Sequence, residues 1–278
     1  MSSNLLETFV IPPRPALLIA MQKELRKRDP DFRKIGYLLR RDPGIAGGLL
    51  KRVNSAFYGL RQPITTIEAA ITFVGSHQLE SLMSSMIAKR MLGGNQMMPR
   101  FWDVSEKRSF GMAYLAVQTR RIAPPLANSL GLFCDIGIPL LKDNISDYLQ
   151  TLKTANAGTD NFVSVEEKHH KISHALIGAK LAQAWGLADE VVLAIRWHHS
   201  SAILQDKSVS PTVLRLVAIN QIVERAIEEF RRDQGYTDKY SEWEENREHV
   251  CLALDLTENR VESLCSDLQV LFAGSSVS

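Results

Sequence analysis

Apolar residues recur at helical spacing along almost the whole chain. Between residues 14 and 25, for example, Leu18, Met21 and Leu25 fall on one face of a helix. No segment alternates apolar and polar residues in the way that a half-buried strand does. The pattern predicts an all-α protein with roughly a dozen helices.

The predicted helices group into two units. Five of them precede the stretch "GGNQMMPR" at 93–100, which is typical of a linker, and form an N-terminal five-helix unit over residues 8–92. The helices of residues 99–230 form a second unit. Residues 231–278 begin with a polar stretch at 231–248 that predicts loop and end in a helix. We expect a multi-helical bundle in which the first unit packs on the second.

The composition agrees with an ordinary globular domain, since 45% of the 278 residues are apolar and 23% are charged. No apolar run reaches the length of about 18 residues that a membrane span needs, and the N-terminus lacks the layout of a signal peptide. Cys134, Cys251 and Cys265 form no Cys-x-x-Cys pair. We therefore expect reduced thiols in a cytoplasmic protein that has no membrane contact.

The net charge of +2 hides an asymmetry between the two halves. Residues 1–130 hold 19 Lys and Arg against 9 Asp and Glu, whereas residues 131–278 hold 14 against 22. The halves thus carry +10 and −8. This split indicates either a surface that meets a charged partner or two solvated faces. An anionic ligand or a nucleic acid at the basic half remains an alternative, although no recognition-helix pattern organises the basic residues.

Candidate metal ligands occur only in the second half. They are Asp135, His169, His170, His174, His198 and His199. Histidine and aspartate side chains from neighbouring helices can converge on a cation inside a bundle. No His-x-x-x-His or His-Glu-x-x-His pair supplies two ligands from one helix, so each residue has a structural interpretation as well. No phosphate-binding loop, dinucleotide fingerprint or nucleophile elbow is present.

Several motifs in the first half occur in a fixed order. They are "IPPRP" at Ile11–Pro15, Asp42-Pro43 before a helix, "NSAFYG" at Asn54–Gly59, and "ITTIEAAI" at Ile64–Ile71. Together they resemble the bacterial HDOD domain, and the likeness extends over about residues 8–230. The resemblance implies an all-helical relative of the HD and HD-GYP phosphohydrolases that serves bacterial signalling as an output or scaffold module.

The resemblance also implies that the metal site is incomplete. Val104, Cys134 and Asn220 stand where the HD pattern has metal-binding residues. The pattern keeps four candidates, which are Asp135, His174, His198 and His199. Valine cannot bind a metal, and a neutral amide is a poor substitute for a carboxylate. We therefore expect a weak or vestigial site with no cofactor and no catalytic residue, and a divalent metal ion remains the alternative.

The leading functional hypothesis is a non-catalytic regulatory module that binds signalling proteins of the same cell. The loop "NSAFYGLRQP" is the candidate contact, with Asn54 and Ser55 shaping it and Tyr58 and Arg61 exposed on it. Asn54 and Ser55 have a structural alternative as turn formers, and Tyr58 as a packing residue. The runner-up is a residual metal-dependent phosphohydrolase acting on a nucleotide or a cyclic dinucleotide.

Overall fold

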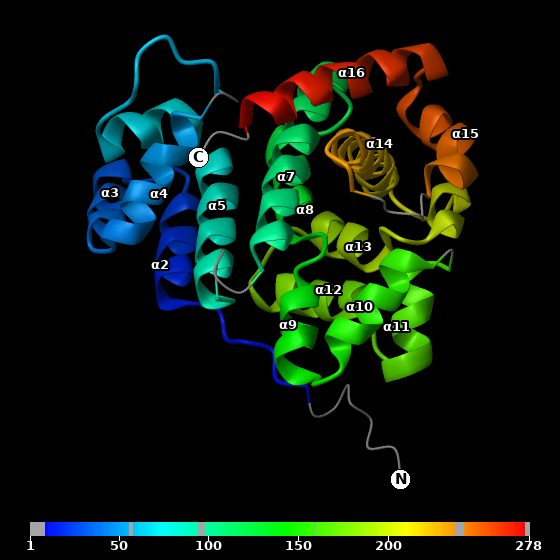
Figure 1. Cartoon of the computed structure of the whole chain (residues 1–278). Helices are drawn as coiled ribbons and strands as arrows, with labels where there is room; N and C mark the ends of the chain where they lie inside the picture. The colour runs from blue at the N-terminus through cyan, green and yellow to red at the C-terminus, as the bar shows by residue number, and fades with distance from the viewer. Residues whose placement is uncertain (1–8, 56–57, 94–97, 159, 237–241, 276–278) are drawn as a thin grey trace. The chain divides into compact units, whose positions relative to one another are not determined.

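The computed structural model describes residues 9–55, 58–93, 98–158, 160–236 and 242–275. Over these residues it contains fourteen α-helices, one 3-10 helix and no strand (Figure 1). The predicted all-α class is therefore confirmed. The chain divides into two compact units, the smaller formed by Arg14–Trp102 with Leu271–Ser278 and the larger by Met1–Pro13 with Asp103–Val270.

Four helices lie wholly within the smaller unit, and the polar residues before two of them explain where these two begin. Asp31 and Asp42 accept hydrogen bonds from free backbone N–H groups at the starts of α3 and α4, as the sequence predicts. Gly75, with φ 73°, kinks the long α5 and so yields the predicted five helical segments. The helices are α2 (Ala16–Leu25), α3 (Phe32–Arg40), α4 (Pro43–Val53) and α5 (Ile67–Met91).

Apart from the first residues of one and the last residues of another, which belong to the smaller unit, the remaining helices lie in the larger unit. Its first members are α7 (Pro99–Thr119), α8 (Pro124–Phe133), α9 (Gly137–Asn144), α10 (Tyr148–Ala157), α11 (Phe162–His170), α12 (His174–Ala184) and α13 (Asp189–Trp197). They are followed by η2 (Ser201–Gln205), α14 (Pro211–Asp233), α15 (Trp243–Leu254) and α16 (Glu258–Ser275), whose last residues belong to the smaller unit.

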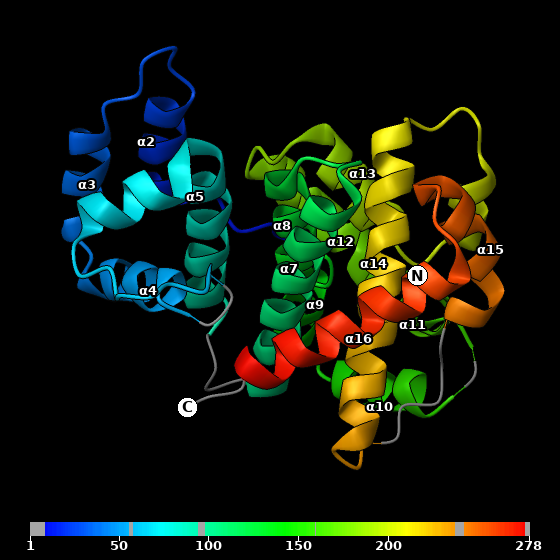
Figure 2. The ribbon, with the colours of Figure 1, turned by 90° about the horizontal axis from the view of Figure 1, so that it is seen from above.

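The polar stretch 231–248 differs from its prediction. In the part of it that the structure describes, Arg231–Asp233 complete α14 and Trp243 begins α15. α15 lies beside α14 in both views (Figure 1 and Figure 2). Its buried Trp243, Val250 and Leu254 form an apolar face spaced at helical intervals, which the many charged residues between them obscure in the sequence.

One stretch in the described residues, Pro124–Asn144, is long and apolar enough to cross a membrane by length and composition alone. No such stretch was expected from the sequence. Of its apolar window, 67% is buried inside the protein. The turn at Cys134–Ile136 also divides it into α8 and α9. The stretch therefore serves as core of the larger unit.

Candidate metal centre

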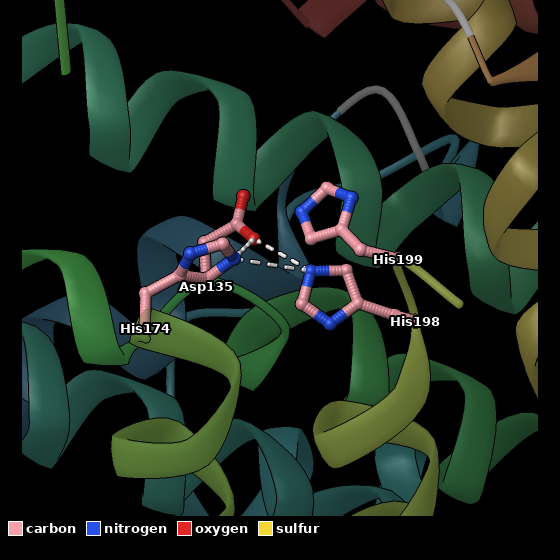
Figure 3. A group of neighbouring side chains, drawn as sticks. All are labelled: Asp135, His174, His198 and His199. Atoms are coloured by element: carbon pink, nitrogen blue, oxygen red, sulfur yellow. Dashed lines mark hydrogen bonds and ion pairs between the residues drawn. The ribbon is translucent and has the colours of Figure 1, made fainter. Parts of the chain in front are cut away.

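Four side chains of the larger unit point toward one another (Figure 3). Asp135 comes from the turn between α8 and α9, and His174 is the first residue of α12. His198 and His199 follow the last residue of α13. One ligand atom from each lies within 4.8 Å of every other. The structure thus brings together the four candidates that the sequence analysis retained, whereas His169 and His170 are not among them.

Local structure explains how Asp135 reaches the histidines. The sequence predicts that residues 132–141 form one apolar helix, but the chain turns at Cys134–Ile136, so Asp135 leaves the helical path. Gly137 then lets α9 approach α12 closely, because a Cβ at this position would overlap the carbonyl oxygen of His174. The glycine is therefore part of what sets the separation between Asp135 and His174.

Three of the four donor atoms have the separations expected around a single metal ion, and a ligand atom of His199 lies within 4.8 Å of each of them. The Nε2 of His198 lies 3.2 Å from Oδ1 of Asp135 and 3.3 Å from the Nε2 of His174. The Nε2 of His174 lies 3.5 Å from the same carboxylate oxygen. Ligands bonded to a tetrahedral metal at the usual distance of about 2.0–2.1 Å lie about 3.3–3.4 Å apart.

Each histidine is also held in the orientation that a metal ligand needs. In every case the Nδ1 faces an oxygen that accepts a hydrogen bond, so the Nε2 faces the other members of the cluster and can bind a metal that displaces any proton it carries. The acceptors are Glu166 for His174 at 2.7 Å, the Ile195 carbonyl for His198 at 2.7 Å, and Glu242 for His199 at 2.6 Å.

The two supporting carboxylates are themselves held in place. Glu166 is fully buried and accepts hydrogen bonds from the hydroxyl of Tyr148 and from the backbone N–H of His174. Glu242 accepts from the side chain of Gln221 at 2.7 Å and from that of Asn161 at 3.2 Å. Such second-layer contacts fix the tautomer and the angle of a ligating imidazole.

Sequence reasoning missed both carboxylates. The spacing of Ser164 and Glu167 predicts a helix start, but α11 begins at Phe162 and Asn161 caps it. With this register Glu166 lies on the buried face with Val165 and His170, a signal that helical periodicity could have provided. No local sequence pattern predicts the role of Glu242, because it contacts His199, which lies 43 residues earlier in the chain.

The carboxylates and imidazoles of the cluster shift one another's pKa values. Burial opposes ionisation of His174, but the carboxylates of Glu166 and Asp135 outweigh it and raise the pKa of His174 to about 10. Burial and the neighbouring His199 lower the pKa of His198 to about 4. Burial also opposes the charged form of Asp135, yet its salt bridge partner and the two histidines hold its pKa well below the usual range.

That salt bridge partner is Arg108, which sequence reasoning also missed. Its guanidinium donates to Oδ2 of Asp135 at 2.6 Å and to Glu224 on α14, and only 4% of its side chain is exposed. Gly131 in α8 allows this contact, because a Cβ there would overlap the backbone of Ser109 in α7. Arg108 follows Val104 by one helical turn, so the guanidinium comes from the helix that lacks the expected histidine.

The substituted positions offer no second set of ligands. The Sγ of Cys134 lies 3.8 Å from Oδ1 of Asn220, and both residues are buried. Burial raises the pKa of the Cys134 thiol well above its usual value, so it remains protonated and is a poor metal ligand. Val104 offers no donor atom. The residues present therefore fit one cation on the histidine side and do not fit a second one beside Arg108.

Two cavities border the cluster, and both are rich in carboxylates. A cavity of about 420 Å³ is lined by Glu167, Glu242, Glu245 and Arg196 among others, with His199 also in its wall. A smaller cavity, of about 60 Å³, contacts His198 and His199; its charged lining residues are Glu224, Arg225, Glu228 and Glu242. These linings attract cations and disfavour a phosphate group. A metal ion bound by the cluster would supply Lewis acidity and ionise bound water.

The four residues proposed for partner binding lie in the smaller unit. Asn54 binds both the N–H and the carbonyl of Ile64 through its side chain, each at 2.7 Å, and so closes the loop as a turn former. Arg61 is exposed and Ser55 is partly buried. Tyr58 differs from its prediction, because it is partly buried and packs edge-on against Phe73 at 5.4 Å. Residues 56 and 57 lie outside the described residues.

The fold is shared with solved all-helical structures. A protein from Shewanella amazonensis, provisionally named a phosphohydrolase, matches all of this chain and 99% of its own with a TM-score of 0.70 and 18% identity. A provisionally named signal transduction protein from Marinobacter aquaeolei matches 99% of this chain and 60% of its own with a TM-score of 0.71 and 17% identity.

The family model of the HDOD domain matches residues 11–201, which is well over half of the chain, so the protein belongs to the HDOD domain family. A curated relative, an uncharacterized protein of Treponema pallidum, is 29% identical over 203 residues. This match covers 68% of the chain but only 38% of the relative's length. The resemblance drawn from the sequence motifs is confirmed.

Proposed function

We propose that this protein is a regulatory module of bacterial signal transduction that acts in the cytoplasm by binding partner proteins and does not hydrolyse phosphate esters. Membership of the HDOD family supports the regulatory role, and so does the likeness to a protein named for signal transduction. The observation that carries the proposal is the buried salt bridge of Arg108 with Asp135.

The salt bridge argues against hydrolysis because of where it places charge. Arg108 neutralises the second carboxylate oxygen of Asp135, and a bidentate or bridging role toward two metal ions is thereby blocked. The carboxylates that line both neighbouring cavities repel a phosphate group as it approaches. A nucleotide phosphate would therefore find one metal ion at most, and the negatively charged carboxylates that line the cavities would repel it.

The loop of residues 54–63 supports the binding role. The Asn54 side chain donates to the carbonyl oxygens of Leu50 and Ile64 and accepts from the N–H of Ile64, and so joins the end of α4 to Ile64 beyond the loop. Arg61 is exposed between the two residues that Asn54 joins. An exposed arginine at such a position suits protein recognition, because arginine is enriched among the residues that dominate binding energy.

An anionic ligand at the basic half receives less support. In the smaller unit Arg26, Lys27, Lys34, Arg40 and Arg90 all form ion pairs with carboxylates of the same unit. The net charge of residues 1–130 is unchanged by these pairs, because their carboxylates are already counted in it, but five of its cations lie beside a carboxylate. Exposed ion pairs of this kind break easily, but they reduce the local potential that would attract an anion.

Two measurements test the proposal. The untagged protein, loaded in turn with Mn²⁺, Fe²⁺ and Zn²⁺, is assayed with bis-(p-nitrophenyl) phosphate and with cyclic dinucleotides. We expect no turnover above that of the Asp135→Ala variant, and turnover that this variant loses would contradict the proposal. In the native cell, a photo-crosslinking residue at position 61 should capture a specific protein that the same residue at Lys153, an exposed position in α10, does not.

A further inference from the structure

The buried charges around the cluster do not balance. Asp135, Glu166, Glu242 and the partly exposed Glu224 bring four carboxylates into contact with the cluster or its salt bridge, while Arg108 and the proton that His174 holds in the absence of a metal bring two positive charges. Buried carboxylates are costly unless cations or hydrogen bonds compensate them. The excess negative charge calls for a further cation on the side of the three histidines.

We infer that Asp135, His174, His198 and His199 bind one divalent transition metal ion, and that this ion strengthens the attachment of helix α15 to the rest of the larger unit through Glu242. Three imidazole nitrogens with one carboxylate oxygen suit Zn²⁺, Fe²⁺ or a similar ion, and are unsuited to Mg²⁺ or Ca²⁺, which prefer oxygen ligands.

The link to α15 runs through a short series of contacts. Glu242 directly precedes Trp243, the first residue of α15, and its carboxylate accepts the Nδ1 proton of His199. A metal on the Nε2 of His199 requires that proton to stay on Nδ1 and makes it a stronger donor. The Glu242 contact, and with it the first turn of α15, is then more stable when the metal is bound.

The coupling involves a segment outside the region that defines the family. The family model matches residues 11–201, whereas Glu242 lies about forty residues beyond its end. Gln221 in α14 joins the same contact, since its side chain donates to Glu242 and to the carbonyl oxygen of His198. Linkage requires the effect to be reciprocal, so a firmly attached α15 also raises the affinity for the metal.

The test uses the full-length, untagged protein and Zn²⁺ as the probe. The variants are His174→Ala and Glu242→Gln, with His169→Ala and Glu244→Gln as matched controls, because His169 and Glu244 are exposed neighbours outside the cluster. If His174→Ala does not fold, His199→Ala replaces it, since 22% of the His199 side chain is exposed. Metal content after desalting, competition with a chelating dye and hydrogen exchange of α15 are measured.

The expected result is one Zn²⁺ per chain for the wild type and both controls, with a melting temperature about 5–10 °C higher at saturating Zn²⁺. His174→Ala should lose stoichiometric binding. Glu242→Gln should weaken affinity about 10–100-fold, as loss of a second-layer partner does, and should lose most of the Zn²⁺-dependent protection of α15.

Two results would overturn the inference. If the wild type retains no more Zn²⁺ than His174→Ala, the cluster is not a metal site. If Zn²⁺ binds but leaves exchange in α15 unchanged, or if Glu242→Gln behaves like Glu244→Gln, the coupling is absent. Neither result depends on crosslinking at position 61, so the proposed partner binding stands or falls separately.

Discussion

The site has two halves that solve the same electrostatic problem differently. On one side Asp135 faces three imidazoles, each held by an oxygen acceptor behind it. On the other side the same carboxylate faces Arg108, beside the uncharged Cys134 and Asn220. On the Arg108 side the negative charge of Asp135 is compensated by a cation of the protein itself. On the histidine side it can be compensated only by a proton or a metal ion taken up from solution.

This difference shows that a site which has lost several metal ligands can still have the residues to bind one metal ion. Replacement of three expected ligands removes one cation position, because the guanidinium of Arg108 takes over its charge. It leaves Asp135, His174 and His198 with donor separations of 3.2–3.5 Å, and a ligand atom of His199 within 4.8 Å of each. Counting ligands in the sequence therefore underestimates what the remaining residues can hold.

The largest effect is expected where the internal cation is removed. Arg108→Ala leaves Asp135 and Glu224 without their buried partner and should lower the free energy of unfolding by about 3–5 kcal/mol. Arg108→Lys should recover part of the loss. The control is Arg121→Ala, which breaks an exposed ion pair with Asp255 and should cost less than about 1 kcal/mol. Urea denaturation that gave equal losses for both alanine variants would contradict the account.

The next effect concerns the approach of α9 to α12. Gly137→Ala should lower the free energy of unfolding by about 1–3 kcal/mol and reduce Zn²⁺ binding, because the new methyl group forces His174 away from Asp135. Gly47→Ala is the control, since Gly47 is exposed in α4 with no atom near its missing Cβ. That change should stabilise by up to about 1 kcal/mol. Thermal denaturation measures the stability of both variants. Unchanged Zn²⁺ binding by Gly137→Ala would show that the close approach of α9 to α12 does not set the geometry of the metal site.

A smaller effect is expected behind His174. Tyr148→Phe removes the hydroxyl that donates to the buried Glu166 and should cost about 1–1.5 kcal/mol of unfolding free energy. Tyr114→Phe is the control, because the hydroxyl of Tyr114 bonds an exposed Asp267 and should contribute less. Zn²⁺ affinity should fall for Tyr148→Phe alone. Equal Zn²⁺ affinity in the two variants would show that Glu166 does not position His174.

The smallest effect is expected on the side without ligands. Cys134→Ser should leave the metal content at one ion per chain, since the protonated thiol takes no part in binding. Elemental analysis of untagged protein measures this directly. A fall in metal content with Cys134→Ser would place the ion on the Cys134 side of Asp135 and would contradict binding by the three histidines.

Local patterns were enough to predict the helices, and the resemblance to the HD pattern selected the four members of the cluster. The caps at Asp31 and Asp42 follow from one residue and its immediate neighbours, and periodicity indicated nearly all the helices. The start of α5 shows the limit of such reasoning, because Thr66 caps it where the sequence suggests Thr65. Either threonine has the right chemistry, and only the path of the chain decides between them.

The electrostatics of the site could not be predicted in this way. Arg108 and Glu242 look like ordinary surface charges in sequence, and they acquire their roles from contacts 27 and 43 residues away. Asp135 was expected within a helix, and its position in a turn depends on how closely Gly137 lets two helices approach. Long-range packing, which no local window contains, produces these arrangements.

Anomalous diffraction from crystals of the untagged protein grown with Zn²⁺ tests the central claim most directly. The account predicts one peak at the zinc edge, about 2.0–2.2 Å from the Nε2 atoms of the histidines and from Oδ1 of Asp135. It predicts no peak between Arg108 and Cys134. A second peak on that side, or none at the histidines, would contradict the account.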